Sequence, residues 1–165
     1  MAASPTYAPI ATANPASGTT ASINFNSFSG YTDLVLVFFG RVSANSGDVK
    51  IRFNSDTNTN YSSTWYGAQP PNYSGRNSNL NAITATEYSY LDSTRDTLSI
   101  INIFNYSTNG VYKPILTRSN KTGYGVEAKV GLWRNTNPIT SIDVFATGAL
   151  YFEGVHLTLY GIAAA

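Results

Sequence analysis

Few side chains in this chain have the chemistry of a catalyst. His156 is the only histidine, and it lies between Val155 and Leu157 in an alternating run that is typical of a β-strand. A histidine base needs a nucleophile or a carboxylate beside it, and nothing in the sequence places one there. The lack of cysteine excludes thiol chemistry and Cys-based metal sites. We therefore expect a structural role for His156.

The carboxylates are the remaining groups that could act as acids or bases. They leave glycoside hydrolysis formally open, because that reaction needs only a pair of them. Five aspartates lie at strand starts or in turns, where a carboxylate commonly caps backbone amides: Asp33, Asp48, Asp56, Asp92 and Asp96. The sequence has no G-x-S-x-G, H-E-x-x-H, P-loop or dinucleotide-binding motif. We predict turn capping for these aspartates and no enzyme activity.

The run from Asp56 to Asn60 has the D-x-N-x-N opening of a calcium-binding loop. Tyr61 then stands where such a loop requires glycine, and Gly67 stands where it requires a bidentate glutamate. We predict an ordinary Asn-rich loop here, and neither a metal nor another cofactor in the protein.

Aromatic side chains are better candidates for a binding surface. Tyr61, Trp65, Tyr66 and Tyr73 crowd one loop-rich region. Such a cluster can pack in the protein's own core, form the centre of a protein interface, or stack on sugar rings. The sequence leaves these three possibilities open, and all four residues are candidates for partner binding.

The N-terminal segment provides a second group of candidates. Residues 1–18 are rich in Ala, Pro, Ser and Thr, and their prolines exclude a helix or a central strand. We predict an extended N-terminal arm over residues 1–18 and a single domain over residues 19–165. Tyr7, Pro9 and Ile10 could dock the arm onto its own domain or leave it free to reach a neighbouring subunit; a loose terminus is the alternative.

The elements that must position these residues have the pattern of strands. The length of 165 residues fits one domain, and β-rich runs alternate with Asn-, Gly- and Pro-containing turns without a convincing helix. The predicted strands cover residues 22–25, 32–43, 48–53, 61–67, 82–91, 97–106, 111–119, 125–133, 139–146 and 155–162. This pattern predicts an all-β fold, an antiparallel two-sheet sandwich that is jelly-roll-like.

Two local signals refine this prediction. Asn109-Gly110 predicts a tight type I′ hairpin between the strands at 97–106 and 111–119, because that turn needs positive φ at both central residues. Pro114 predicts that the second of these strands lies at a sheet edge or contains a bulge.

The charge of the chain argues against some partners. The net charge is +1 and only 12% of the residues are charged, so no general field attracts nucleic acid or anionic lipid. The first residues lack the pattern of a secretion signal, and the longest apolar run suits a buried strand rather than a membrane span. We expect a soluble domain that binds neither nucleic acid nor membranes.

The order of several motifs carries a resemblance to a known group of proteins. The motifs are YTDLVLVFFGR, VKIRFNSDTNTNYSSTWYG, FNYSTNGVYKPILTRSN, VGLWRNTNPITSIDVF and FEGVHLTLYGI. Together they resemble small β-sandwich virion proteins of tailed bacteriophages, cyanophages included: capsid cement (decoration) proteins and related tail-fibre modules. The most specific pieces are R-F-N-x-D-x-x-x-N-Y at residues 52–61 and G-L-W-R at residues 131–134.

The resemblance implies a structural role in the virion and supplies no catalytic residues. It implies a cement protein, made in the host cytoplasm, that binds the major capsid protein on the capsid surface, and by analogy a homotrimer. A domain that fills the chain and a short arm favour this role. The alternative is a tail-fibre or tail-tip module that binds a host receptor or glycan through the region from Tyr61 to Tyr73.

Overall fold

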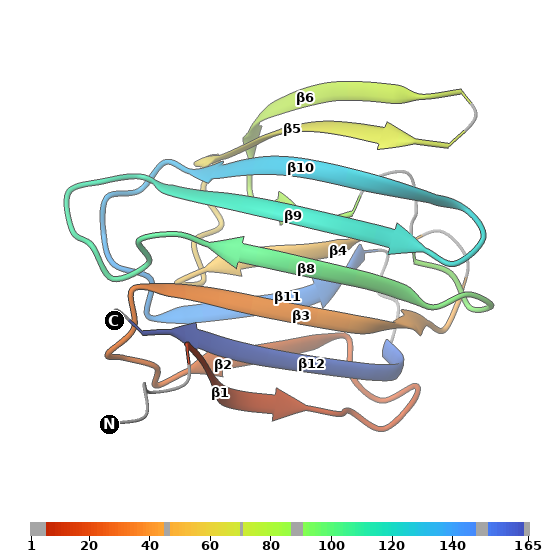
Figure 1. The fold of residues 1–165 in the computed structure, drawn as a ribbon, viewed down its shortest axis with the longest axis horizontal. Coiled ribbons are helices and arrows are strands. Elements are labelled where there is room, and N and C mark those ends of the chain that lie inside the picture. Colours follow the sequence, from red (N-terminus) through yellow and green to blue (C-terminus); the bar gives the residue numbers. More distant parts are fainter. Residues whose placement is uncertain (1–5, 45–46, 70, 87–90, 148–151, 164–165) are drawn as a thin grey trace.

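The computed structural model describes residues 6–44, 47–69, 71–86, 91–147 and 152–163. This part of the chain contains twelve strands and no α-helix. The strands form two sheets in which every neighbouring pair is antiparallel, and Figure 1 shows one sheet stacked on the other. The predicted all-β two-sheet sandwich is therefore confirmed.

The larger sheet has eight strands in the order β1 (Tyr7–Ala13), β12 (Phe152–Ile162), β3 (Asp33–Val42), β8 (Thr97–Ile103), β9 (Lys113–Lys121), β10 (Gly125–Trp133), β5 (Tyr61–Ala68) and β6 (Tyr73–Leu80). The smaller sheet has the order β2 (Ser22–Asn26), β11 (Ser141–Ala146), β4 (Val49–Phe53) and β7 (Ile83–Thr84). This division into eight and four strands departs from an eight-stranded jelly roll.

The hydrophobic core lies between the sheets because successive side chains of a strand point to opposite faces. On β3 the inward residues Leu34, Leu36 and Phe38 are fully buried. On β4 the alternate residues Val49 and Phe53 are fully buried as well. The larger sheet extends beyond the smaller one at β6, where most residues are exposed (Figure 1). One end of the larger sheet is therefore a strand that is largely open to solvent.

The N-terminal arm belongs to the larger sheet. β1 pairs with β12 from Tyr7 opposite Ile162 to Ala13 opposite Leu157, with a register shift after Pro9. Proline is tolerated there because β1 is an edge strand and the shift marks an irregularity in the ladder. The segment is extended, as predicted, but it docks onto its own domain. The expectation that it is free to reach a partner is wrong for residues 7–13.

The connection between β8 and β9 differs from the predicted tight turn. Gly110 has a φ of 84°, but Asn109 is not among the residues with positive φ, so the type I′ prediction is wrong. The chain instead makes a longer loop, in which the Gly110 amide donates to the Thr136 carbonyl at 2.9 Å. A contact distant in sequence therefore sets the geometry of this loop.

Pro114 lies in an interior strand, so its assignment to an edge or a bulge is wrong. β9 runs between β8 and β10 without a register shift against either. The last residue of β8, Ile103, pairs with Ile115, so Pro114 lies one residue beyond the β8 ladder. The missing N–H of proline costs little at the end of a ladder.

The structure also differs from the prediction in two segments between β5 and β8. The predicted strand over residues 82–91 contains β7 at Ile83–Thr84 and an isolated bridge from Leu91 to Gly47, while its residues 87–90 lie outside the described part of the chain. β6, with the sequence YSGRNSNL, lies outside the predicted strands. It has few residues that favour strands, and its pairing with β5 holds it in the sheet.

Candidate interaction surface

The outer face of the larger sheet carries apolar side chains where a solvated antiparallel sheet normally carries polar ones. The strand register aligns its outward side chains in three rows that run from β12 to β5. The first row is Tyr160, Val35, Asn102, Leu116, Val130 and Thr64; the second is Thr158, Val37, Ile100, Arg118, Ala128 and Tyr66; the third is His156, Phe39, Leu98, Asn120, Val126 and Ala68. We call these residues the sheet-face patch.

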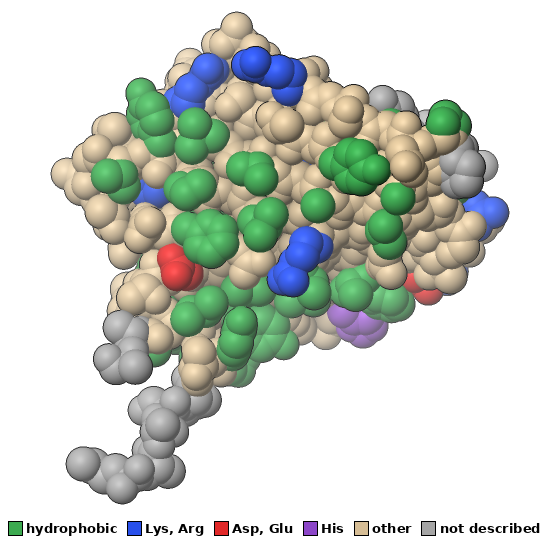
Figure 2. Space-filling model, turned by 45° about the horizontal axis from the view of Figure 1, so that its top comes forward, with side chains coloured by type: hydrophobic (Ala, Val, Ile, Leu, Met, Phe, Trp, Pro, Cys, Tyr) green, Lys and Arg blue, Asp and Glu red, His purple; other side chains and the backbone are tan. Residues whose placement is uncertain are grey.

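Several apolar residues of the sheet-face patch are open to solvent, whereas Val35 is buried and Val37, Ile100, Leu116 and Tyr160 are half-buried. Val130, Tyr66 and Val126 are 58%, 57% and 56% exposed, and Phe39 and Leu98 are also exposed. Figure 2 shows hydrophobic side chains spread across this face with few charged side chains among them. Scattered exposed apolar residues are normal, but a contiguous group of this kind marks an interaction site.

The sheet-face patch is not flat, because shallow depressions cross it, and two of them adjoin Arg118. One, of about 360 Å³, is lined by Tyr7, Val35, Val37, Ile100, Asn102, Arg118 and Tyr160. The other, of about 260 Å³, is lined by Leu98, Ile100, Arg118, Ser119, Asn120, Val126 and Glu127. Arg118 and Ile100 line both depressions. These two residues therefore separate two apolar hollows that a partner's side chains could fill.

Arg118 is the one side chain of the sheet-face patch with a permanent charge. It is exposed, and its Nη2 donates to Asn102 Oδ1 on the neighbouring strand at 3.4 Å, which is a long hydrogen bond. Among the residues that the structure describes, no carboxylate forms a salt bridge with it. The charge is therefore available to a partner.

The predicted aromatic cluster divides between the two faces of the sheet. Tyr61 is fully buried, and its hydroxyl donates to the Phe53 and Asp56 carbonyls at 3.3 and 3.2 Å. Trp65 also points inward and is buried. Of the aromatic residues on β5, only Tyr66 points outward, and it belongs to the sheet-face patch. The loop-rich region is thus mainly core, with one exposed tyrosine.

The other predicted candidates also lie in different environments. The hydroxyl of Tyr73 on β6 donates to Glu127 Oε2 at 3.1 Å, on the inner side of the sheet. Tyr7 lines the larger depression and adjoins the sheet-face patch, and Pro9 pairs with Tyr160. Ile10 packs against the core. Of these four residues, Tyr7 and Pro9 border the sheet-face patch.

The sequence analysis did not predict most residues of the sheet-face patch, because the alternation of a strand such as β10 does not show which of its faces is buried. Its residues alternate between apolar Val126 and Val130 and charged Glu127 and Lys129. In the structure the charged residues point inward and are buried, while the valines point to solvent. Lys129 Nζ lies 3.8 Å from Glu127 Oε1 and 5.3 Å from the Trp65 ring centroid, so the buried charges have partners.

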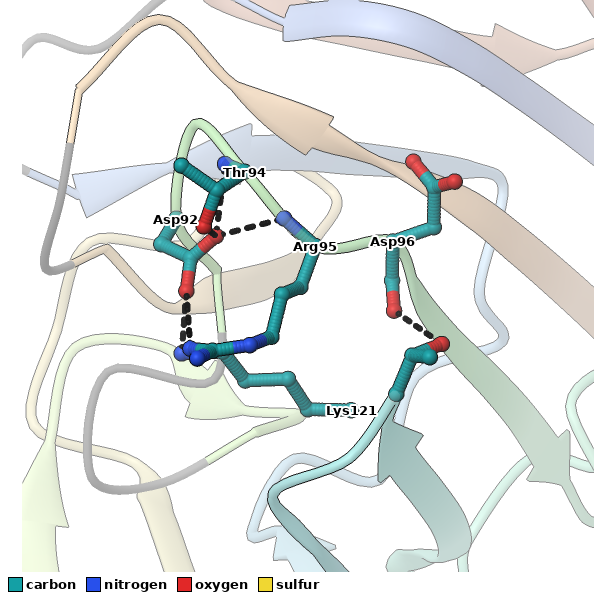
Figure 3. Close-up of polar contacts among 6 residues, drawn as sticks. Asp92, Thr94, Arg95, Asp96 and Lys121 are labelled. Atoms are coloured by element: carbon teal, nitrogen blue, oxygen red, sulfur yellow. Dashed lines mark hydrogen bonds and ion pairs between the residues drawn. The ribbon is translucent and has the colours of Figure 1, made fainter.

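Asp92 forms the centre of a second polar cluster, which is structural. Its Oδ2 lies 2.7 Å from Lys121 Nζ on β9, and its Oδ1 accepts from the amides of Thr94 and Arg95 at 2.8 and 2.7 Å (Figure 3). Burial raises the pKa of Asp92, but the hydrogen bonds from Lys121, Thr94 and Arg95 outweigh it and lower the pKa well below its ordinary value. The predicted capping role is confirmed here.

This lowered pKa predicts acid sensitivity. A carboxylate with a depressed folded pKa stabilises the protein above its unfolded pKa, and that stability is lost as the pH falls toward the folded value. We expect the free energy of unfolding to fall between about pH 5 and about pH 2, and Asp92→Asn to flatten this dependence. Urea titrations across this range test it. Parallel pH profiles for the wild type and Asp92→Asn would contradict the assignment.

Asp56 organises its own loop, which is the segment with the calcium-loop opening. Its Oδ2 accepts from Trp133 Nε1 at 2.8 Å and from Asn60 Nδ2 at 2.9 Å, while Oδ1 accepts from the Asn58 amide at 3.0 Å. Burial raises its pKa, but these hydrogen bonds outweigh burial and the pKa is lowered. The described residues contain no group of three His, Asp or Glu side chains placed to hold a metal ion.

His156 is a strand residue at the border of the sheet-face patch. Its Nδ1 lies 2.9 Å from Asn14 Oδ1, and its ring stacks on Phe39 with centroids 6.5 Å apart. Asp33, another predicted cap, accepts from the Asn105 amide at 2.7 Å. These contacts join strands and loops within the domain. They assemble no nucleophile with a base.

Comparisons with protein-family models, curated proteins and solved structures give no match for this chain. Within the residues that the structure describes, no helix has the length and apolar character needed to cross a membrane. The candidate site that the geometry offers is the sheet-face patch, an apolar surface around one arginine.

Proposed function

We propose that this chain is a structural protein of a tailed-bacteriophage virion, and that it binds the outside of the capsid as a cement protein. The observation that carries the proposal is the exposed, apolar sheet-face patch. A cement protein needs a broad surface that stays apolar in the free subunit and is buried at a joint of the shell. The motif resemblance supports the biological setting, and the sheet-face patch supplies a surface suited to it.

Cementing requires no catalytic group. A protein that binds the assembled shell but not its separated subunits stabilises the shell by mass action. Each copy contributes through the area that it buries, and many copies act together on one particle. We propose the major capsid protein as the partner; the homotrimer stays a prediction by analogy.

The surroundings of Tyr66 favour a protein partner over a glycan. The shallow depression beside it is lined by Tyr66, Ala68, Val126, Glu127 and Ala128, so its walls are mainly apolar. A sugar site pairs an aromatic platform with several polar groups that bind hydroxyls. Tail-tip binding of a receptor therefore remains the alternative and is an outcome of the test below.

We expect the purified protein to co-sediment with capsids assembled from the major capsid protein of the same phage, and to raise the temperature at which those capsids disassemble. Val130→Lys should weaken binding, because docking would bury its charge. Ser22→Lys, which adds the same charge to an exposed site on the smaller sheet, is the matched control. Binding to tail tips instead of capsids would contradict the proposal, and equal binding by both variants would exclude the sheet-face patch.

A further inference from the structure

We propose that Arg118 is the anchor of the sheet-face patch, and that it binds a carboxylate set within an apolar area of the partner protein. This inference rests on the proposed function, because it names the chemistry of the capsid surface to be recognised. Arg118 lies in the middle row on β9, with Ile100 and Ala128 as its neighbours across the strands. It is thus near the centre of the face, with apolar Ile100 and Ala128 across the strands and with Asn102 and Asn120 also beside it.

The surroundings of Arg118 indicate which chemical group of the partner protein would contact it in the complex. In the free protein the exposed guanidinium is open to water, and within the described residues its hydrogen bond is the long one to Asn102. Docking an apolar surface over this face would remove the water, and a buried charge without a partner is costly. A carboxylate is the group that best compensates the buried positive charge, because its two oxygens can accept hydrogen bonds from two N–H donors of the guanidinium.

The size of the face is sufficient for a specific protein complex. With strands about 4.8 Å apart and rows about 6.7 Å apart, the three rows on six strands span a plane of roughly 600 Å². Tyr7 and Pro9 on β1 extend it further. A specific interface buries at least roughly 500 Å² and typically roughly 800 Å² on each partner, and its energy concentrates in central arginine and aromatic residues. Arg118 lies near the centre of the face, which is where the residues that contribute most to binding energy are found.

The same arginine argues against the other occupants of an apolar sheet face. A second copy stacked by a two-fold axis over the whole face would bring two Arg118 side chains together at the centre, where like charges repel. A phosphate polymer requires several clustered cations, and the sheet-face patch has one permanent charge. A protein surface that is apolar and contains a carboxylate complements both the apolar area and the positive charge of the sheet-face patch.

The test compares Arg118→Glu, Arg118→Gln and wild-type protein for binding to capsids assembled from the major capsid protein. We expect Arg118→Gln to weaken binding at least about 30-fold and Arg118→Glu at least about 100-fold, because removal of a buried charge partner is costly in either case and reversal adds repulsion. Arg118 is exposed, so both variants should unfold at the wild-type denaturant midpoint. In addition, one Asp→Arg or Glu→Arg substitution on the capsid protein should restore the binding of Arg118→Glu.

The outcomes distinguish a failure of the Arg118 anchor proposal from a failure of the proposed function. If Arg118→Glu binds like wild type while Val130→Lys fails, the face is the site and the anchor proposal is wrong. If both variants bind like wild type, binding to capsids persists but through another surface. If wild-type protein does not bind capsids, the proposed function itself fails. Formation of a dimer by wild-type protein that Val130→Lys abolishes would overturn the proposal in favour of a second copy.

Discussion

Replacing Asp92 by alanine is expected to lower the free energy of unfolding by about 3–5 kcal/mol. Asp92 and Lys121 are both more than nine-tenths buried, and the ion pair between them spans 2.7 Å. Without the carboxylate, Lys121 loses this partner in a buried position, and the Thr94 and Arg95 amides lose their acceptor. Urea denaturation at neutral pH measures the change.

Two companion variants make this result specific. The double variant Asp92→Ala with Lys121→Met removes both charges, so it should be more stable than Asp92→Ala alone. Asp143→Ala removes a carboxylate from the smaller sheet, where it accepts from Asn24 Nδ2 at 2.6 Å, and should cost about 1 kcal/mol or less. If Asp92→Ala is no more harmful than Asp143→Ala, the cluster does not stabilise the fold as described.

Replacing Trp133 by alanine is the second change with a large expected effect, again about 3–5 kcal/mol of unfolding free energy. Trp133 is fully buried, and its ring centroid lies 5.5 Å from that of Phe53 and 6.3 Å from that of Tyr61. Its indole N–H donates to Asp56, which holds the Asn-rich loop. The substitution therefore removes both a large core side chain and the cross-link from β10 to that loop.

Trp133→Phe separates these two effects, since it retains most of the ring volume but lacks the N–H donor. It should cost about 1–2 kcal/mol. Tyr66→Ala is the control, because this aromatic residue on β5 is exposed, and it should change stability by less than about 1 kcal/mol while weakening capsid binding. A Trp133→Ala protein as stable as Tyr66→Ala would contradict the assignment of Trp133 to the core.

The sequence predicts strands better than it predicts which of their faces is buried. In β10 the alternation shows that Val126 and Val130 share one face and Glu127 and Lys129 share the other, but not which face is inside. Tertiary packing determines which face of β10 is buried. Trp133 lies on the same face as the charged pair and packs in the core. The inward charges are acceptable because each has a partner, and the valines are left outside. The candidate interaction surface follows from this orientation.

The weakest parts of the prediction are elements whose structure depends on a distant partner. β1 contains proline and few large apolar groups, and it becomes a strand because β12 offers an edge for pairing. β6 likewise depends on β5. The loop that contains Gly110 is held by Thr136, from the segment after β10. Local residue preferences do not contain these contacts, whereas the buried strand β3 is evident from its own apolar run.

Under the proposed function, the outer face of the eight-stranded sheet binds the shell. A density map of decorated capsids at side-chain resolution tests it most directly. The proposed function predicts that the sheet-face patch lies against the major capsid protein, with a carboxylate opposite Arg118 and the smaller sheet facing solvent. A map in which this face is open to solvent, while the smaller sheet or the loops contact the shell, would contradict the proposed function.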